Sequence, residues 1–241
     1  MKLGKRLSQI ESMVTSEYTH IWDCCCDHGF LGANLLAENK APTIHFVDIV
    51  PSLMASLETK LKRYFPNQQF TDMNAEEDAK SKWQIHCMNV ADLPIAQHSG
   101  KQLVIIAGVG GDLTIQLIRD IQQANPECEL DFLLCPVHQQ YLVRQGLQQL
   151  DFHLQTECLV EENRRYYEVI LASNPATSTG NHKAITTVGC QIWNVNSEQE
   201  HVVATRYLKN TLAHYQRMQR SNDEQVEAIL RAYQQVSIEM R

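Results

Sequence analysis

The chain has 241 residues, of which 44% are hydrophobic and 20% are charged, and its formal net charge is −7 at pH 7. This hydrophobic content is typical of a globular protein and excludes a chain that is mostly disordered. No run of 18 apolar residues is present, which argues against a membrane-spanning helix. The negative charge excludes a nucleic-acid binder that relies on overall charge alone, so any phosphate contact needs a local basic patch.

Cysteine spacing bears on both disulfides and metal binding. Three of the eight cysteines, Cys24, Cys25 and Cys26, are adjacent, and adjacent cysteines do not easily form a disulfide with each other. No Cys-x-x-Cys pair is present. We therefore expect reduced thiols in a cytoplasmic protein and no metal site. The N-terminus is basic but has no apolar segment after it, so we expect no secretion signal.

Short apolar runs and helical stretches alternate along most of the chain. Residues 3–14 are predicted to form an amphipathic helix, because apolar residues recur there at spacings of three and four. The runs that predict strands are 19–25, 43–49, 84–89, 103–109 and 130–136. The clearest predicted helices are 51–64, 112–124 and 139–150. This alternation favours an α/β fold with a mostly parallel sheet.

The last third of the chain has a different organisation. Two apolar runs, 152–160 and 165–172, are separated by four polar residues, which predicts an antiparallel hairpin at one edge of the sheet. Residues 173–183 are small, polar and turn-prone, so they are the best linker candidate. We therefore divide the chain into residues 1–175 and residues 176–241.

The tail from about residue 197 has a helical composition without Gly or Pro. A break near 221–223 predicts two helices that form a hairpin. The apolar face of the first helix is predicted to consist of Ala204, Leu208, Leu212, Tyr215 and Met218.

The most informative stretch follows the first predicted strand and runs from Asp23 to Gly32. In open α/β sheets, ligands bind beyond the carboxyl ends of the strands. This stretch carries Asp23, Asp27 and His28, and it lacks the glycine pattern that lets a pyrophosphate approach the backbone. It is suited to a cofactor with a cationic end, such as S-adenosylmethionine. The alternative is an ordinary turn in which Asp27 caps the next helix.

Polar residues also end the next predicted strands. Asp48 can accept both hydroxyls of an adenosine ribose, because a carboxylate has two acceptor oxygens, or it can cap the helix that starts near residue 51. Asn89 is a candidate to read the exocyclic amine of an adenine. After the fourth strand, three glycines within 108–111 predict a close approach of a ligand to the backbone.

The order and spacing of these segments resemble the bacterial tRNA (adenine(22)-N1)-methyltransferases, the TrmK family. The matching segments are 3–7, 23–28, Asp48-Ile49, Asn89, 106–111, 136–138 and 161–169. The resemblance implies a Rossmann-like class I methyltransferase sheet with a C-terminal helical domain. It also implies methyl transfer from S-adenosylmethionine to N1 of an adenine in tRNA. The family usually has glycine at Cys25, glutamate at Asp48 and methionine at Val109.

The resemblance also implies the residues of the site. The expected cofactor contacts are Asp23, Cys25, Asp27, His28, Asp48, Ile49, Asn89, Val90, Ala107 and Gly108. Asp27 and the Gly108 carbonyl are candidate catalytic groups, because methylation creates positive charge on the base. Adenine N1 is blocked in a base pair, so the target must be unpaired or flipped out. The candidates to stack on it are Phe30, His138, Tyr166 and Tyr167.

Contact with tRNA requires a basic surface, which we expect from Arg164, Arg165, Arg206, Lys209, Arg217 and Arg220. The four on the C-terminal helix fall within an arc of about 80°, opposite the apolar face, although a solvated helix face has the same pattern. Lys5 and Arg6 are expected to add to this surface. Two alternatives stay open: a methyltransferase of a small molecule, and a non-catalytic binding protein that lost the cofactor through Cys25. We expect no membrane partner, and either a monomer or a weak dimer.

Overall fold

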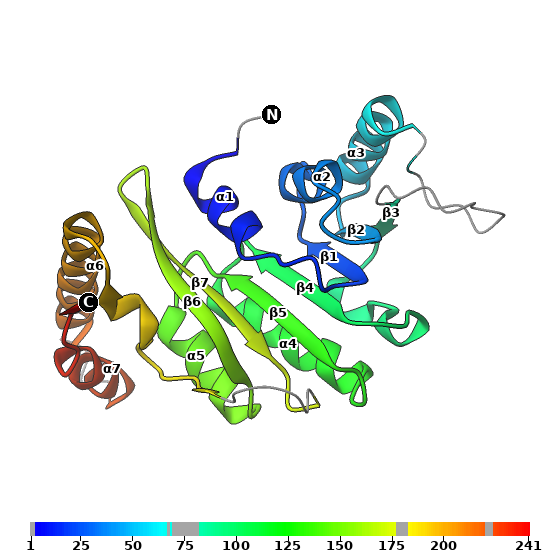
Figure 1. Ribbon diagram of the computed structural model, residues 1–241. Helices are drawn as coiled ribbons and strands as arrows, with labels where there is room; N and C mark the ends of the chain where they lie inside the picture. Colours follow the sequence, from blue (N-terminus) through cyan, green and yellow to red (C-terminus); the bar gives the residue numbers. More distant parts are fainter. Residues whose placement is uncertain (1–2, 67, 69–81, 177–182, 220–223) are drawn as a thin grey trace.

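The computed structural model describes residues 3–66, 68, 82–176, 183–219 and 224–241 (Figure 1). The strands are β1 (His20–Cys24), β2 (Thr43–Asp48), β3 (Lys82–Cys87), β4 (Gln102–Ala107), β5 (Leu130–Cys135), β6 (His153–Glu162), β7 (Arg165–Ser173), β8 (Lys183–Ala184), β9 (Asn194–Val195) and β10 (Glu239–Met240). The α-helices are α1 (Lys5–Ser12), α2 (Phe30–Ala37), α3 (Pro51–Tyr64), α4 (Gly111–Ala124), α5 (Gln140–Gln149), α6 (Glu198–Met218) and α7 (Glu224–Gln234). Short 3₁₀ turns are η1 (Val90–Asp92), η2 (Ile95–Gln97) and η3 (Gln191–Trp193).

Eight of the described strands form one sheet in the order β3-β2-β1-β4-β5-β7-β6-β8. The first five in this order run parallel, while β7 pairs antiparallel with β5 and forms a hairpin with β6. The prediction of a mostly parallel sheet with an antiparallel edge hairpin is confirmed. The strand order reverses at β1 and β4, so the loops after these two strands flank the point where ligands bind in open α/β sheets.

The edge hairpin differs from the prediction in its turn. The sequence predicts a four-residue link, yet β6 continues to Glu162 and only Asn163 and Arg164 connect the two strands. Both residues have positive φ, 52° and 62°, as in a two-residue type I′ turn, whose twist matches that of the strands. The backbone groups of polar residues can still pair between two strands, so an exposed hairpin can continue through them. The polar side chains of 161–164 therefore suggested a longer link than the structure has.

Helices cover both faces of the sheet (Figure 1). On one face, α1, α2 and α3 bury a cluster that includes Ile21 of β1, and on the other, α4 and α5 bury a cluster that includes Trp22. Neighbouring residues of β1 belong to different clusters because successive side chains of a strand point to opposite faces. This alternation decides which polar side chains of β1 can meet which loops.

The helix α2 is the one that the sequence did not single out. Its residues are apolar almost throughout, so they show no amphipathic period. In contrast, α3 spans Pro51–Tyr64 as predicted, and α4 and α5 begin and end within one residue of their predicted bounds. Periodicity therefore located the helices that have one solvent-facing side.

Between the hairpin and the C-terminal helices, the chain crosses the segment 173–183 that was predicted as a linker. Ser173 ends β7 and Lys183 begins β8, which pairs antiparallel with β6. Residues 177–182 lie outside the described residues. Since β8 joins the sheet from beyond residue 175, the division into residues 1–175 and 176–241 stays a prediction.

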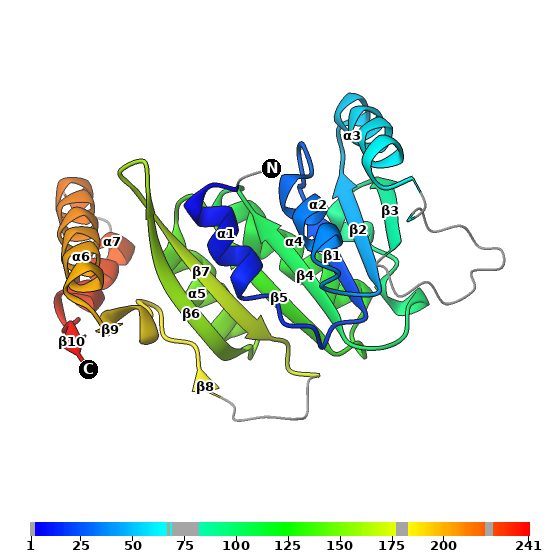
Figure 2. The same cartoon turned by 45° about the horizontal axis from the view of Figure 1, so that its top comes forward.

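The helices α6 and α7 pack against each other beside β6 (Figure 2). Ser197 caps α6, because its hydroxyl accepts a hydrogen bond of 3.2 Å from the Glu200 N–H. The predicted apolar face of α6 is confirmed for its first four members, which pack in a cluster with α7, whereas Met218 is exposed. The predicted break near 221–223 lies outside the described residues. Within the described ranges, no helix has the length and apolar character needed to cross a membrane.

Three buried charged side chains connect the sheet and α5 to α6. The side chain of Arg144 in α5 is fully buried and forms ion pairs of 2.6 Å with Glu157 of β6 and with Glu168 of β7. The other oxygen of Glu168 accepts a hydrogen bond of 2.6 Å from the Tyr207 hydroxyl of α6. Burial opposes the ionisation of Glu157, but Arg144 and the Cys190 N–H outweigh burial and lower the pKa of this carboxyl.

Replacement Tyr207→Phe removes the hydroxyl and leaves the buried Glu168 carboxylate with one donor fewer. We expect the free energy of unfolding, measured by urea denaturation, to fall by about 1.5–3 kcal/mol, the range for hydrogen bonds to charged groups. Tyr215→Phe is the control, because Tyr215 packs in the same cluster and is expected to lose less than about 0.5 kcal/mol. Equal losses in the two variants would contradict the role given to Tyr207.

Candidate functional site

The loop between β1 and α2 has a strained conformation. Cys25, Asp27 and Gly29 have positive φ, at 54°, 50° and 69°, a region that glycine enters without steric cost and other residues do not. Two backbone hydrogen bonds close the loop, from the Cys26 N–H to the Val47 carbonyl at 3.2 Å and from the Gly29 N–H to the Cys26 carbonyl at 2.7 Å. Backbone strain at a strand end beside the switch point is typical of a functional loop.

Asp23 forms the floor of this loop. It is 4% exposed, and its carboxylate accepts a hydrogen bond of 2.9 Å from the Gly32 N–H in the first turn of α2. Gly32 permits this approach, since a Cβ atom there would lie 2.8 Å from the same oxygen. Burial raises the pKa of Asp23 to about 7, with Asp48 adding to the shift and the Gly32 N–H opposing it. A carboxyl group with such a pKa at a strand end is a candidate functional group.

Asp48 at the end of β2 ties its strand to the same loop. Its Oδ2 accepts a hydrogen bond of 3.0 Å from the Asp27 N–H, and its Oδ1 accepts one of 3.1 Å from the Val50 N–H. The second bond holds the N–H of Val50, which is itself the N-cap residue of α3, and among the described residues no side-chain hydrogen bond caps that helix, so the helix-capping alternative for Asp48 is wrong. The first bond directs the carboxylate toward the loop. Each oxygen has further acceptor capacity, so these two bonds do not exclude a ligand contact.

Asp27 and His28 are exposed at the tip of the loop. The alternative in which Asp27 caps α2 is wrong, because the N-cap residue is Gly29 and the capping carboxylate belongs to Asp23. The Asp27 carboxylate instead lies 3.8 Å from His28 Nε2. The His28 ring is tilted against Phe30, with 5.7 Å between the ring centroids. These side chains therefore form the exposed tip of the loop whose buried end holds the Asp23 carboxyl.

The third strand is followed by Asn89 and Val90, which we expected at the adenine. Asn89 is exposed, and its Oδ1 accepts a hydrogen bond of 3.1 Å from the Ala91 N–H, which caps η1. Val90 is buried and packs in the core below α4 and α5, so its backbone is the part that can meet a ligand. The contact of either residue with an adenine stays a prediction.

Two of the three glycines after β4 have a packing role. A Cβ atom on Gly110 would lie 2.9 Å from His138 Nε2, and one on Gly111 would lie 2.8 Å from the Gln139 Cβ. The Gly111 N–H also donates to the His138 carbonyl at 3.2 Å. Packing of the segment after β5 thus accounts for these two glycines, and the expectation that the glycines make room for a ligand stays a prediction.

Gly108 keeps an open backbone, and Arg6 lies beside it. Gly108 has a φ of 90°, and the nearest heavy atom to a Cβ built there is Nη1 of Arg6, at 3.6 Å. Arg6 was expected on a basic surface, but its guanidinium lies over the Tyr167 ring, 5.2 Å from the centroid. Its Nη1 is buried and has no hydrogen-bond partner among the described residues. The sequence did not place Arg6 beside Gly108, because α1 and β4 are distant along the chain.

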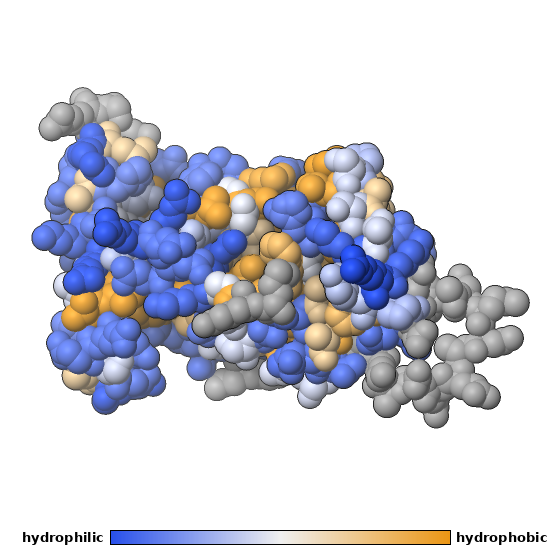
Figure 3. All heavy atoms as spheres, turned by 90° about the horizontal axis from the view of Figure 1, so that it is seen from above, coloured by the Kyte–Doolittle hydropathy of each residue, from blue (hydrophilic) through white to orange (hydrophobic). Residues whose placement is uncertain are grey.

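Large apolar side chains are exposed around the same strand ends. Phe30 follows β1, Ile49 follows β2 and Val137 follows β5, and their exposed fractions are 41%, 68% and 40%. Figure 3 views the molecule from the side of the β6–β7 turn, and this face carries apolar patches among hydrophilic ones. Apolar rims around a few convergent polar groups are typical of small-molecule sites.

The residues expected to contact tRNA are exposed where the structure describes them, namely Arg164, Arg165, Arg206, Lys209 and Arg217. The first two lie at the β6–β7 turn, and the other three lie on α6 away from its buried face. Arg220 lies outside the described residues. Both β5 and β6 are antiparallel to β7, so the turn projects from the same edge as the carboxyl ends of the parallel strands.

Residues 3–170 match the methyltransferase domain family. This match spans more than half of the chain, and the chain therefore belongs to that family. No curated protein matches the sequence.

Solved structures share the fold over nearly the whole chain. M. capricolum TrmK in complex with S-adenosyl-homocysteine aligns with a TM-score of 0.69 and 14% identity, covering 97% of each chain. The B. subtilis m1A22 tRNA methyltransferase TrmK aligns with a TM-score of 0.67 and 17% identity, covering 97% of this chain and 94% of that chain. Magnesium protoporphyrin IX methyltransferase from Synechocystis PCC 6803 has a TM-score of 0.52 and 10% identity, covering 70% of this chain and 83% of that chain. These likenesses establish a Rossmann-like methyltransferase fold.

The strain at Cys25 gives a stability test. A Cβ atom at positive φ costs about 1–2 kcal/mol, so we expect Cys25→Gly to be more stable than Cys25→Ala by about 1 kcal/mol in urea denaturation. At Cys26, which does not have positive φ, the order is expected to reverse, because glycine loses more backbone freedom on folding. Greater stability of the alanine variant at both positions would show that the loop is not strained at Cys25.

Proposed function

We propose that the protein is an S-adenosylmethionine-dependent methyltransferase that acts on N1 of an adenine in tRNA. The observation that carries the proposal is the pair of carboxyl groups, Asp23 and Asp48, which meet at the β1–α2 loop of a methyltransferase-family fold. The structures that share the fold over nearly the whole chain include a tRNA m1A22 methyltransferase and a TrmK with S-adenosyl-homocysteine bound. By that similarity, adenine 22 is the proposed target.

The loop suits S-adenosylmethionine in charge and in hydrogen-bonding groups. The Asp23 carboxylate is suited to the ammonium group of the cofactor, the acceptor oxygens of Asp48 to the ribose hydroxyls, and the exposed Ile49 side chain to a face of the adenine. Cys25 adopts a conformation that suits the glycine usual in the TrmK family, and its side chain packs against the core cluster that contains Trp22. Loss of the cofactor through Cys25 is therefore not favoured.

We propose the full set of cofactor contacts on the same grounds. They are Asp23, Cys25, Asp27, His28, Asp48, Ile49, Asn89, Val90, Ala107 and Gly108. When bound, the cofactor supplies a methyl group that is activated by a positively charged sulfur.

Alignment is the main task left to the protein. Adenine N1 has an in-plane lone pair, so no base needs to remove a proton, and correct orientation alone can lower the barrier by up to about 7–11 kcal/mol. Gly108 has no side chain and leaves room for the reacting groups at its carbonyl. Methylation leaves positive charge on the base, and Asp27 and the Gly108 carbonyl are proposed to stabilise that charge.

The target adenine must leave its base pair or its stack to reach the carboxyl ends of the parallel strands. Tyr166 and Tyr167 are engaged by Tyr207 and by a guanidinium group, whereas Phe30 and His138 are exposed beside the strand ends. We therefore propose the latter two as stacking partners.

Binding of tRNA needs cations on the side of the strand ends, because the net charge of −7 repels phosphates. The β6–β7 turn carries Arg164 and Arg165, and the outer face of α6 carries further basic residues. A groove runs between α1, β6 and α6, and Lys5, Arg164 and Lys183 line it among acidic residues. We propose that the turn, the groove and the outer face of α6 form the tRNA surface.

A small methyl acceptor is the second candidate. The magnesium protoporphyrin IX enzyme resembles 70% of this chain, whereas the tRNA enzyme resembles 97%. The exposed basic residues of α6 favour a large anionic substrate over a small one.

Incubation with labelled S-adenosylmethionine and bulk bacterial tRNA tests the function. We expect nucleoside analysis to find 1-methyladenosine, and we expect the label to disappear when adenine 22 of a transcript is replaced by guanine. Label at another base would contradict the proposed target. Calorimetric binding of S-adenosylhomocysteine without transfer to RNA would favour the small acceptor, and absence of binding would overturn the proposal.

The affinity for S-adenosylhomocysteine is expected to depend on pH through Asp23. The pKa of this carboxyl is raised to about 7, and only its ionised form attracts an ammonium group. The affinity should therefore rise about tenfold between about pH 6 and about pH 8, as measured by calorimetry. Asp23→Asn keeps an acceptor for the Gly32 N–H but should bind more weakly and lose this slope. His28→Asn is the control, because it changes an exposed residue of the same loop and leaves Asp23 in place, and loss of the slope in this variant would contradict the role given to Asp23.

Charge reversal on α6 tests the tRNA surface. Arg206→Glu combined with Lys209→Glu is expected to weaken tRNA binding at least about tenfold and to lower the slope of log affinity against log salt by about 2, while the affinity for S-adenosylhomocysteine stays unchanged. The matched control reverses Lys62 and Arg63 in the last turn of α3, at the other end of the sheet. Equal losses in both double variants would show a nonspecific charge effect, and no loss would exclude α6.

A further inference from the structure

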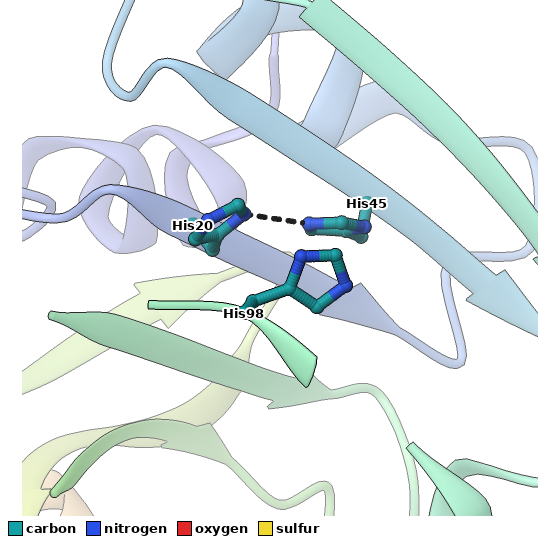
Figure 4. A group of neighbouring side chains, drawn as sticks. All are labelled: His20, His45 and His98. Carbon is teal, nitrogen blue, oxygen red and sulfur yellow. Dashed lines mark hydrogen bonds between the residues drawn. The ribbon is translucent and has the colours of Figure 1, made fainter. Parts of the chain in front are cut away.

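Four histidines gather on the face of the sheet opposite Asp23. His20 of β1, His45 of β2 and His86 of β3 project on the same side as Trp22. His98 follows η2, and its ring packs against those of His20 and His45 (Figure 4). The Nδ1 of His20 lies 3.0 Å from the Nε2 of His45. The methyltransferase function proposed above uses none of these residues.

The arrangement has the dimensions of a metal site. The ligand atoms of His20, His45 and His98 all lie within 4.8 Å of one another. A tetrahedral zinc ion binds imidazole nitrogens at about 2.0–2.1 Å, which separates the nitrogens by about 3.3 Å. To bind such an ion, the nitrogens of His20 and His45, now 3.0 Å apart, would separate slightly, and the ring of His98 would move toward them. That movement is plausible geometrically, because His98 is half-buried on a loop and its ring nitrogens form no hydrogen bond among the described residues.

Burial keeps the rings of the cluster in the neutral form, which is compatible with a bound metal ion but does not by itself favour one. Burial lowers the pKa of His20 to about 4 and the pKa of His45 to about 2, and it also lowers the pKa of His98. The three rings are therefore neutral at neutral pH, which is the form that ligates metals. Imidazoles without a carboxylate select zinc, copper, nickel or cobalt rather than magnesium or calcium.

Surrounding residues hold the ligands in place. The Nδ1 of His45 lies 2.9 Å from His86 Nε2, so with its Nε2 on a metal, His45 can donate its remaining N–H to His86, as metal-bound histidines usually do. Trp22 stacks on His45 at 3.7 Å between ring centroids, with 10° between the planes. The Gln102 side chain accepts from the Trp22 indole N–H at 2.9 Å and donates to the His98 carbonyl at 3.0 Å. One buried amide thus positions both the ring that supports His45 and the loop that carries His98.

We propose that His20, His45 and His98 bind one divalent transition-metal ion, with zinc as the natural occupant and a fourth position open to water. Such an ion would cross-link β1, β2 and the loop after η2. It would lie on the other face of β1 from Asp23, so its first expected effect is on stability rather than on methyl transfer. The competing outcome is a chain of neutral imidazoles that satisfy one another by hydrogen bonds and bind no metal.

The test uses the full-length chain without a histidine tag, stripped with EDTA and titrated with Co²⁺ and then Zn²⁺. We expect one equivalent of Co²⁺ with the visible absorption of a tetrahedral ion, displacement by Zn²⁺, and a rise in the unfolding temperature with Zn²⁺. His98→Ala should lower the Co²⁺ affinity at least about tenfold, and His20→Ala should do the same. His214→Ala, at an exposed position on α6, is the control and should bind as the parent does.

The cysteines of the β1–α2 loop are the main competing ligands, and the spectrum separates them. Thiolate ligation of Co²⁺ adds an intense near-ultraviolet charge-transfer band, which a site of three histidines lacks. That band would overturn the proposal, as would the absence of stoichiometric binding or an unchanged affinity in His98→Ala. Circular dichroism of each variant confirms that a lost site does not reflect a lost fold.

Discussion

The arrangement of the C-terminal half depends on Arg144, a positive charge whose side chain is fully buried. A buried guanidinium is tolerated only when carboxylates neutralise it, and here Glu157 and Glu168 of the two hairpin strands do so. Glu168 extends the network to Tyr207 of α6. Glu157 extends it to two backbone N–H groups of the segment before α6, each at 2.6 Å. One network therefore fixes the hairpin, this segment and α6 together.

This network connects the hairpin to α6 through directional contacts. Replacing a buried ion network with apolar residues is often neutral for stability, whereas removing one partner is costly. We therefore infer that the ion pairs of Arg144 serve to select one placement of α6 against the hairpin. That placement determines where the basic residues of α6 and of the β6–β7 turn stand relative to the carboxyl ends of the parallel strands, where methyl transfer is proposed.

Strand β1 contributes to two polar sites, the cofactor loop and the histidine cluster, which lie on opposite faces of the sheet. Asp23 points toward α2 and forms the floor of the cofactor loop, whereas His20 and Trp22 point toward η2 and join the histidine cluster. Successive side chains alternate between faces, so the two groups share a strand without sharing an environment. Burial acts on both in the sense that favours the neutral form, raising the pKa of Asp23 and lowering that of His20.

The sequence by itself determined the alternation of parallel strands and helices, the bounds of α3 and the acidic ends of β1 and β2, because apolar periodicity and strand ends are encoded in neighbouring residues. It also carried the resemblance from which the family was recognised. Only the tertiary structure decided that Gly110 makes room for His138, that Arg6 reaches Gly108, and that His98 closes over β1 and β2. These contacts join residues far apart in the chain, and strand register and helix packing bring them together.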